Sequence, residues 1–150
     1  MLFKKGRPSH YFVCTWEQAD FDHLGIAVGD CAAQTFFEVL VLVLAVELWG
    51  SSSRPAVILG DNVPALQEAL DMKGKGAQEP LAQALAVVVT SRSLGGLVVA
   101  HLPTEANTIA DALSRQHEPG NTKAWPFAPN QDRLQEDVPV CPRELWGWIE

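Results

Sequence analysis

The chain lacks the cysteine pattern of a disulfide-rich or zinc-binding protein. Its three cysteines, Cys14, Cys31 and Cys141, are widely separated, and no CxxC pair occurs. An odd, scattered count fits reduced thiols in an intracellular protein better than a disulfide framework, and it argues against structural zinc. We therefore expect an intracellular protein, without distinguishing the cytoplasm from the nucleus.

Long apolar runs are also missing. The longest apolar stretch, residues 36–49, is interrupted by Glu38 and Glu47. A membrane-spanning helix needs ~20 largely uncharged apolar residues, so this segment predicts a buried helix and no membrane association. The basic residues near the N-terminus are not followed by an apolar run, which argues against a secretory signal.

Basic charge is scarce as well, because the 11 Lys and Arg residues are outnumbered by 18 Asp and Glu residues and the formal net charge is −7. Lys and Arg contacts with phosphates supply most of the sequence-independent affinity for nucleic acids. This balance argues against tight, free-standing binding to nucleic acid. The charge balance is still compatible with a domain that acts on a nucleic acid held mainly by a neighbouring module.

What the sequence does contain is the material of one globular domain, with 150 residues of which 47% are hydrophobic and 19% charged. β-Formers, apolar runs and Pro or Gly boundaries predict alternating strands and helices, hence an α/β domain with a partly parallel sheet flanked by helices. Residues 116–150, with recurrent Pro and Trp, are predicted to be a tail or linker after a domain over residues 1–115. The predicted elements are strands 10–17, 56–60 and 95–100, helices 35–49, 63–72, 78–91 and 107–115, and a loop over 18–34.

Two glutamates fall within the long apolar helix. Burying an ionised carboxylate costs several kcal/mol unless it is paired, so Glu38 either lies at the edge of a face or serves a site. Glu47 is nine positions later, which at ~100° per residue places it on the opposite side of the helix. Only one of the two can belong to a given site, and the other is expected to be solvated or capping.

Two aspartates are also notable by position. Asp61 directly follows the strand 56–60, and ligands of open α/β sheets bind at the carboxyl ends of parallel strands. A turn or helix-capping role explains Asp61 equally well. Asp111 lies one helical turn after Asn107, and a solvated aspartate favoured by the helix dipole is the plain alternative there.

The segment HLPTEANTIADALSR, residues 101–115, is long and distinctive. It resembles the closing motif of the ribonuclease H domains of retroelement reverse transcriptases of the long-terminal-repeat and tyrosine-recombinase types. Thr104 departs from that motif, which usually has glycine there. The matching positions are His101, Pro103, Asn107, Ala110, Asp111, Leu113, Ser114 and Arg115.

Two further segments resemble the same family in the same order. QTFFEVLVLVLAVELW is similar to the helix that carries the family's catalytic glutamate, and VILGDNVPAL is similar to its strand followed by Asp-Asn. The resemblance covers about residues 8–115. It implies a ribonuclease H-like fold and assigns metal-binding, catalytic roles to Glu38, Asp61 and Asp111.

The resemblance implies a definite chemistry. In this family clustered carboxylates bind two Mg²⁺ (or Mn²⁺) ions, which activate water and stabilise the leaving oxygen as the RNA strand is hydrolysed. The implied substrate is an RNA–DNA hybrid, and the implied partner is the polymerase domain of the same polyprotein. His101 could shuttle a proton, although a structural or hydrogen-bonding role is the simpler interpretation.

One departure from the family opens an alternative. The family's first aspartate lies on an opening central strand, and its spacing places that residue at or before Met1, so we expect the first strand to be missing. Asp20, Asp22 and Asp30 come after the first predicted strand and cannot replace it without rearrangement. The alternative function is therefore a catalytically inactive remnant that keeps the fold and binds nucleic acid weakly at most.

Overall fold

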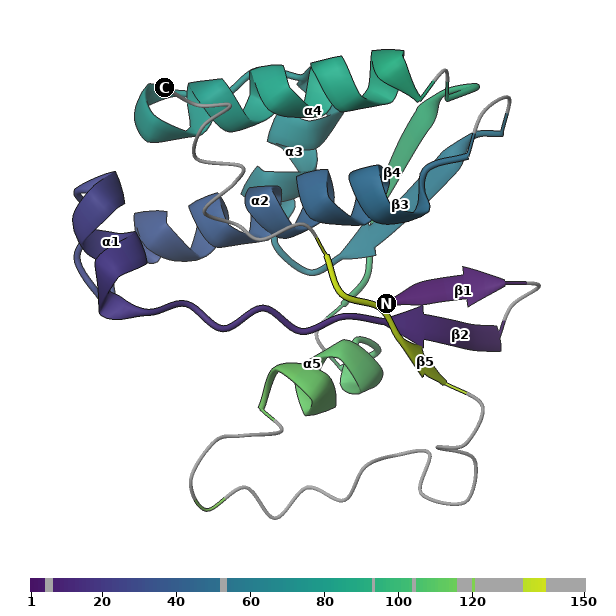
Figure 1. Ribbon diagram of the computed structural model, residues 1–150, viewed down its shortest axis with the longest axis horizontal. Helices are drawn as coiled ribbons and strands as arrows, with labels where there is room; N and C mark the ends of the chain where they lie inside the picture. The colour runs from purple at the N-terminus through teal and green to yellow at the C-terminus, as the bar shows by residue number, and fades with distance from the viewer. Residues whose placement is uncertain are drawn as a thin grey trace.

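A computed structural model describes residues 1–4, 7–51, 54–92, 94–103, 105–115, 120 and 134–139 of the chain. Strands and helices follow one another along it, and the class is α/β, as predicted (Figure 1). The elements in chain order are β1 (Leu2–Lys4), β2 (Arg7–Tyr11), α1 (Gln18–Leu24), α2 (Cys31–Trp49), β3 (Ala56–Gly60), α3 (Val63–Asp71), the 3₁₀ helix η1 (Gly76–Gln78), α4 (Glu79–Ser91), β4 (Leu97–His101), α5 (Thr108–Ser114) and β5 (Gln135–Glu136).

The described strands form two sheets. The first has the order β1-β2-β5 and is mixed, because β1 pairs antiparallel with β2 while β5 pairs parallel with it. The second is the parallel pair β3–β4, in which Ala56 is opposite Leu97 and Gly60 is opposite His101. The parallel component of the predicted sheet is therefore present, but the strands are divided between two sheets.

Helix α2 forms the centre of the core. Its side chains Val39, Leu40 and Val43 are 0% exposed and Phe36 is 1% exposed. A helix that is apolar on all sides is stable only when neighbours cover it, and α2 packs against both α3 and α4. Burial thus overrides the weak helix propensity of its valines. The predicted helix is confirmed, and it begins four residues earlier than expected, at Cys31.

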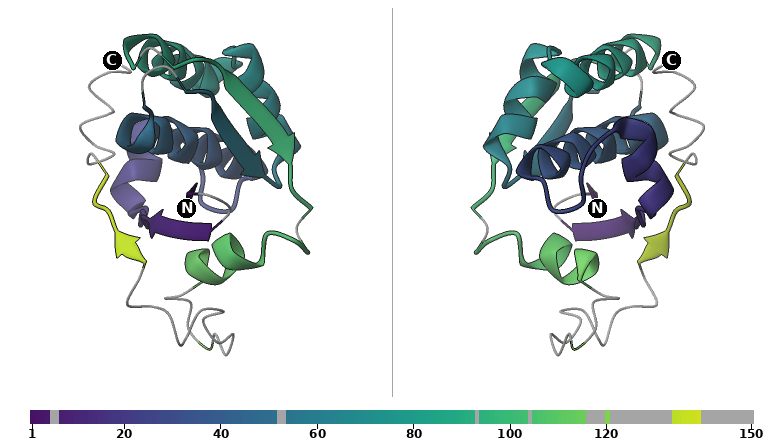
Figure 2. Two further views of the ribbon diagram at one scale, coloured as in Figure 1. Left: turned by 90° about the vertical axis from the view of Figure 1, so that its right-hand side faces the viewer. Right: turned by 90° about the vertical axis from the view of Figure 1, so that its left-hand side faces the viewer.

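The three long helices gather on one side of the molecule. Figures 1 and 2 show α2, α3 and α4 grouped together, with the β1–β2 hairpin and then α5 beyond α2. The inner side chains of the parallel pair, including Ile58 and Val99, pack against the core. The alternate side chains are exposed, to 63% for Val57, 54% for Leu59 and 50% for Val98.

The strand predicted over residues 10–17 was largely wrong. β2 ends at Tyr11, and residues 12–17 have no regular structure. The apolar residues of this segment, Phe12, Cys14 and Trp16, nevertheless pack against the core, and the Trp16 ring stacks on Phe37 with centroids 4.5 Å apart. The apolar pattern reflects side-chain packing rather than strand pairing.

The loop predicted over residues 18–34 was also wrong, since it contains α1 and the start of α2. The side chain of Asp20 accepts a hydrogen bond from the backbone N–H of Glu17 at 2.8 Å, which fixes the first turn of α1. Gly25 ends the helix with a left-handed backbone (φ 63°), a conformation that glycine adopts without strain.

The remaining predicted elements agree closely with the structure. β3 spans the predicted residues, α3 and α4 differ from their predicted ranges by one residue at one end, and β4 is displaced toward His101. Most of the predicted tail, 116–150, lies outside the described residues, of which only 120 and 134–139 belong to it. Among the helices that the structure describes, none is long and apolar enough to cross a membrane.

Candidate functional site

Glu38 and Asp61, 23 residues apart in sequence, come together where α2 passes the carboxyl end of β3. Burial raises the pKa of Glu38 above its ordinary value, and the negative charge of Asp61 raises it further. Hydrogen bonds from Asn62 and Gln34 act in the opposite direction, because they stabilise the ionised form. The charges of two of the three predicted site residues, Glu38 and Asp61, therefore influence each other in the folded chain.

Local structure explains how each carboxylate reaches this position. Glu38 is half-buried on α2, where Gln34, one turn earlier, donates a hydrogen bond from Nε2 to Glu38 Oε1 at 3.3 Å. Asp61 follows the last residue of β3, and Asn62 begins α3 as its N-cap. The Asn62 side chain accepts a hydrogen bond from Ala65 N at 3.1 Å, so the chain turns sharply after the strand.

The donor set at this position suits a hard divalent cation. Carboxylate and amide oxygens are the ligands that Mg²⁺ and Mn²⁺ prefer, and the two negative charges of Glu38 and Asp61 repel each other without a counterion. Burial is the main cause of the raised pKa of Glu38, and the negative charge of Asp61 adds a smaller contribution in the same direction. Glu38 and Asp61 therefore have the ligand chemistry that the predicted cation site requires.

Asp111 has a different environment. It lies in the first turn of α5, where Arg115, one turn later, donates from Nε to Asp111 Oδ1 at 2.7 Å. In the part of the chain that the structure describes, no three His, Cys, Asp or Glu side chains are grouped so as to hold a metal ion. The three-carboxylate site therefore stays a prediction.

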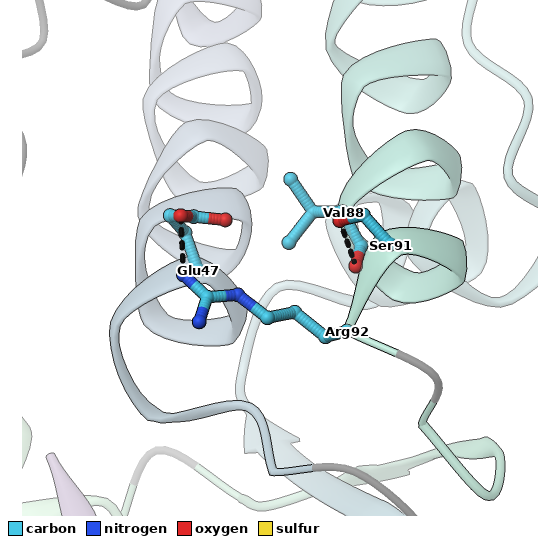
Figure 3. A network of polar contacts seen from close by, with 4 residues as sticks. All are labelled: Glu47, Val88, Ser91 and Arg92. Atoms are coloured by element: carbon cyan, nitrogen blue, oxygen red, sulfur yellow. Dashed lines mark hydrogen bonds and ion pairs between the residues drawn. The ribbon is translucent and has the colours of Figure 1, made fainter.

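Glu47, the second glutamate of α2, belongs to an ion pair. Figure 3 shows its carboxylate meeting the guanidinium of Arg92, which follows the end of α4. Beside it, Ser91 Oγ donates to the carbonyl of Val88 at 3.1 Å. We expected the glutamate outside the site to be solvated or capping. Glu47 is partly exposed, and its pair with Arg92 also links the ends of two packed helices.

His101 lies near the candidate site through strand pairing. It is the last residue of β4 and is opposite Gly60, the residue before Asp61. The backbone N–H of Leu102 donates to the carbonyl of Gly60 at 2.8 Å, which holds the two strand ends together. His101 itself is exposed. The structure thus brings His101 to the same sheet edge as Asp61.

Sequence reasoning missed the polar side chains around the carboxylates. Asn62 donates from Nδ2 to Thr35 Oγ1 at 3.4 Å, linking the start of α3 to α2. Gln34 precedes Glu38 by one helical turn, a spacing that predicts contact. Asn62 followed by Pro64 is itself a helix-start signal that could have assigned the cap. The contact with Thr35, in contrast, is tertiary and leaves no local signal.

No family model, curated protein or solved structure matches this chain.

Proposed function

We propose that the chain is the ribonuclease H part of a retroelement reverse transcriptase, which hydrolyses the RNA strand of RNA–DNA hybrids with Mg²⁺ or Mn²⁺. The observation that carries the proposal is the meeting of Glu38 and Asp61 at the carboxyl end of a parallel strand. The motifs that resemble this family lie on α2, on β3 with α3, and on β4 with α5, in the family's order.

Under this proposal Glu38 and Asp61 would hold the cation, and Asp111, now paired with Arg115, would be the third ligand. Divalent cations bound in such a site supply charge stabilisation to the attacking and leaving oxygens of a phosphoryl displacement, with two ions in a complete site. Gln34 donates to the Glu38 carboxylate and helps to orient it. His101, exposed at the adjacent strand end, would be accessible to a substrate bound there.

The finer fold proposed is ribonuclease H-like with its first strand missing. Parallel sheets are usually covered on both faces, and sheets usually have more than two strands. The pair β3–β4 instead exposes Val57, Leu59 and Val98 on one face, and among the described residues each of its strands has a single partner. A further strand that carries the remaining carboxylate would pair at a free edge and enlarge this sheet. With a net charge of −7, a polymerase domain of the same polyprotein is the proposed holder of the hybrid.

The second candidate is an inactive remnant of the same fold. Its supporting observation is Asp111, whose carboxylate is bound by Arg115 rather than placed beside Glu38. A protein with two assembled carboxylates can retain cation binding and lose hydrolysis.

Cleavage of a labelled RNA–DNA hybrid tests the proposal. The folded chain is incubated with Mg²⁺ or Mn²⁺ beside Asp61→Asn and, as a matched control, Asp71→Asn, an exposed carboxylate at the end of α3. Cleavage by the parent and by Asp71→Asn, with none by Asp61→Asn, supports the nuclease. Absence of cleavage by folded parent protein supports the remnant, and cleavage by Asp61→Asn contradicts the assigned site.

A further inference from the structure

The short strand β5 covers the edge of β2 that faces away from β1 (Figure 1). It pairs in parallel, with Tyr11 opposite Glu136, and the backbone N–H of Asp137 donates to the carbonyl of Tyr11 at 2.8 Å. Both residues of β5 are exposed, and Val138 shortly after them is 87% exposed. The contact therefore depends mainly on polar groups rather than on apolar burial.

Two aromatic side chains bind the two acidic residues of this segment. The Tyr11 hydroxyl donates to Glu136 Oε2 at 3.1 Å. The indole N–H of Trp49, the last residue of α2, donates to Asp137 Oδ2 at 2.7 Å, and the Phe12 ring packs against that indole with centroids 5.0 Å apart. Hydrogen bonds to an ionised acceptor are stronger than those between neutral groups. The edge of β2 and the end of α2 thus offer donors to two consecutive carboxylates.

The charge of the β1–β2 hairpin also favours an acidic segment. Residues 1–16, which include both strands, contain Lys4, Lys5 and Arg7 and no Asp or Glu, in a chain whose formal net charge is −7. Complementary charge speeds the approach of a partner, and like charge disfavours the wrong ones. The hairpin is therefore matched in charge to an acidic segment, although the chain as a whole is not.

We propose that the edge of β2 is a docking site for an acidic, extended segment of another polypeptide, and that residues 135–137 occupy it in the isolated chain as an exchangeable strap. When a strand is added to a sheet edge, backbone hydrogen bonds supply affinity and side-chain contacts supply selectivity. Tyr11 supplies both kinds of contact, and Trp49 binds the second carboxylate. A two-residue strand held by few contacts separates at low free energy, so a partner can replace it. This inference does not depend on the proposed nuclease function.

Nuclear magnetic resonance of the isotope-labelled full chain tests the inference, because the indole N–H of Trp49 gives its own signal, which Trp49→Phe assigns. The strap is disabled by Glu136→Ala combined with Asp137→Ala. A charge-matched control combines Asp71→Ala with Glu105→Ala, which remove two exposed carboxylates outside β5. Slow hydrogen exchange of the α2 amides shows that each variant is folded. Asp137→Ala alone replaces the double variant if that protection is lost.

The probe is the capped peptide Leu-Gln-Glu-Asp-Val-Pro, the sequence of residues 134–139, and its control has Gln and Asn in place of Glu and Asp. We expect the disabled variant to shift the Trp49 indole signal, and the acidic peptide to move it back toward its position in the parent. A tethered strap competes at an effective concentration of about 1 mM, so the peptide should bind the parent and the charge-matched control at least about tenfold more weakly. The neutral peptide should bind the disabled variant about tenfold more weakly than the acidic one.

Each part of the inference has its own contrary result. If the acidic peptide leaves the Trp49 signal of the disabled variant unchanged, the docking site is overturned. Equal effects of the acidic and the neutral peptide overturn the preference for carboxylates. Equal affinity of the peptide for the parent and for the disabled variant overturns the strap, because an occupied edge must bind a competitor more weakly than a vacant one.

Discussion

Replacing Glu38 with glutamine should change stability in opposite directions with and without a divalent cation. In a chelator the variant removes a half-buried charge that burial and Asp61 both disfavour. Because Glu38 is also partly solvated and screened, we expect a gain of about 0.5–1 kcal/mol at neutral pH, the scale of charge interactions at partly exposed sites. With cation at about 100 times its dissociation constant, the parent gains ~2.7 kcal/mol that the variant lacks.

The pH dependence follows from the direction of the pKa shift. A carboxyl whose pKa is raised by folding favours the folded state below the pKa of the unfolded chain, whose ordinary value is 4.5. That contribution is lost as pH rises through the folded-state pKa of Glu38. The advantage of Glu38→Gln in chelator should therefore be present at neutral pH and should disappear in acid, below the ordinary pKa.

Urea unfolding followed by tryptophan fluorescence measures this reversal. Glu47→Gln is the matched control, because Glu47 lies on the same helix but is paired with Arg92. It should lose up to about 1 kcal/mol, and Mg²⁺ should stabilise it as much as the parent. A Glu38→Gln variant that is less stable than the parent in chelator, or a parent that Mg²⁺ and Mn²⁺ leave unchanged, would refute the reasoning.

Three further substitutions test the fold. Leu40→Ala removes a side chain that is 0% exposed, and we expect a loss of about 2–5 kcal/mol in chemical unfolding. Trp49→Phe removes the donor to Asp137 Oδ2 at 2.7 Å, so the amides of residues 135–137 should exchange hydrogen faster while those of α2 stay protected. Gly74→Ala places a Cβ 2.5 Å from the backbone of Gln78, which should cost about 1–3 kcal/mol in thermal or urea unfolding.

The elements that sequence predicted well are those with local signals. The strand 56–60 is a short apolar run bounded by Pro55 and by Gly60 itself, and Pro64 marks the first turn of the helix after it. The wrong prediction of a strand beyond Tyr11 has a physical cause. The side chains of that segment pack on Phe37 and Trp49 through ring contacts, which produce an apolar pattern without any strand partner.

The sequence allowed the carboxylates of the candidate site to be identified, but it did not predict how they lie relative to one another in space. An acidic residue at a strand end and an acidic residue on an apolar helix are both visible in the sequence, so Asp61 and Glu38 could be named. Their meeting depends on how α2 packs across β3, which no local pattern encodes. Thr35 and Asn62 were missed for the same reason, because their contact joins residues 27 positions apart.

The Asp111–Arg115 ion pair is only weak evidence against a metal site that includes Asp111. An exposed pair one helical turn apart contributes ~0.3–0.5 kcal/mol, whereas a cation at about 100 times its dissociation constant supplies ~2.7 kcal/mol. β4 ends at His101 and α5 begins at Thr108, seven residue steps later, a span of at most about 25 Å. This tether limits how far α5 can lie from the edge that carries Asp61. Under the proposed function, Asp111 would join the site through a reorientation of α5, and a bound cation would supply the positive charge that attracts this third carboxylate.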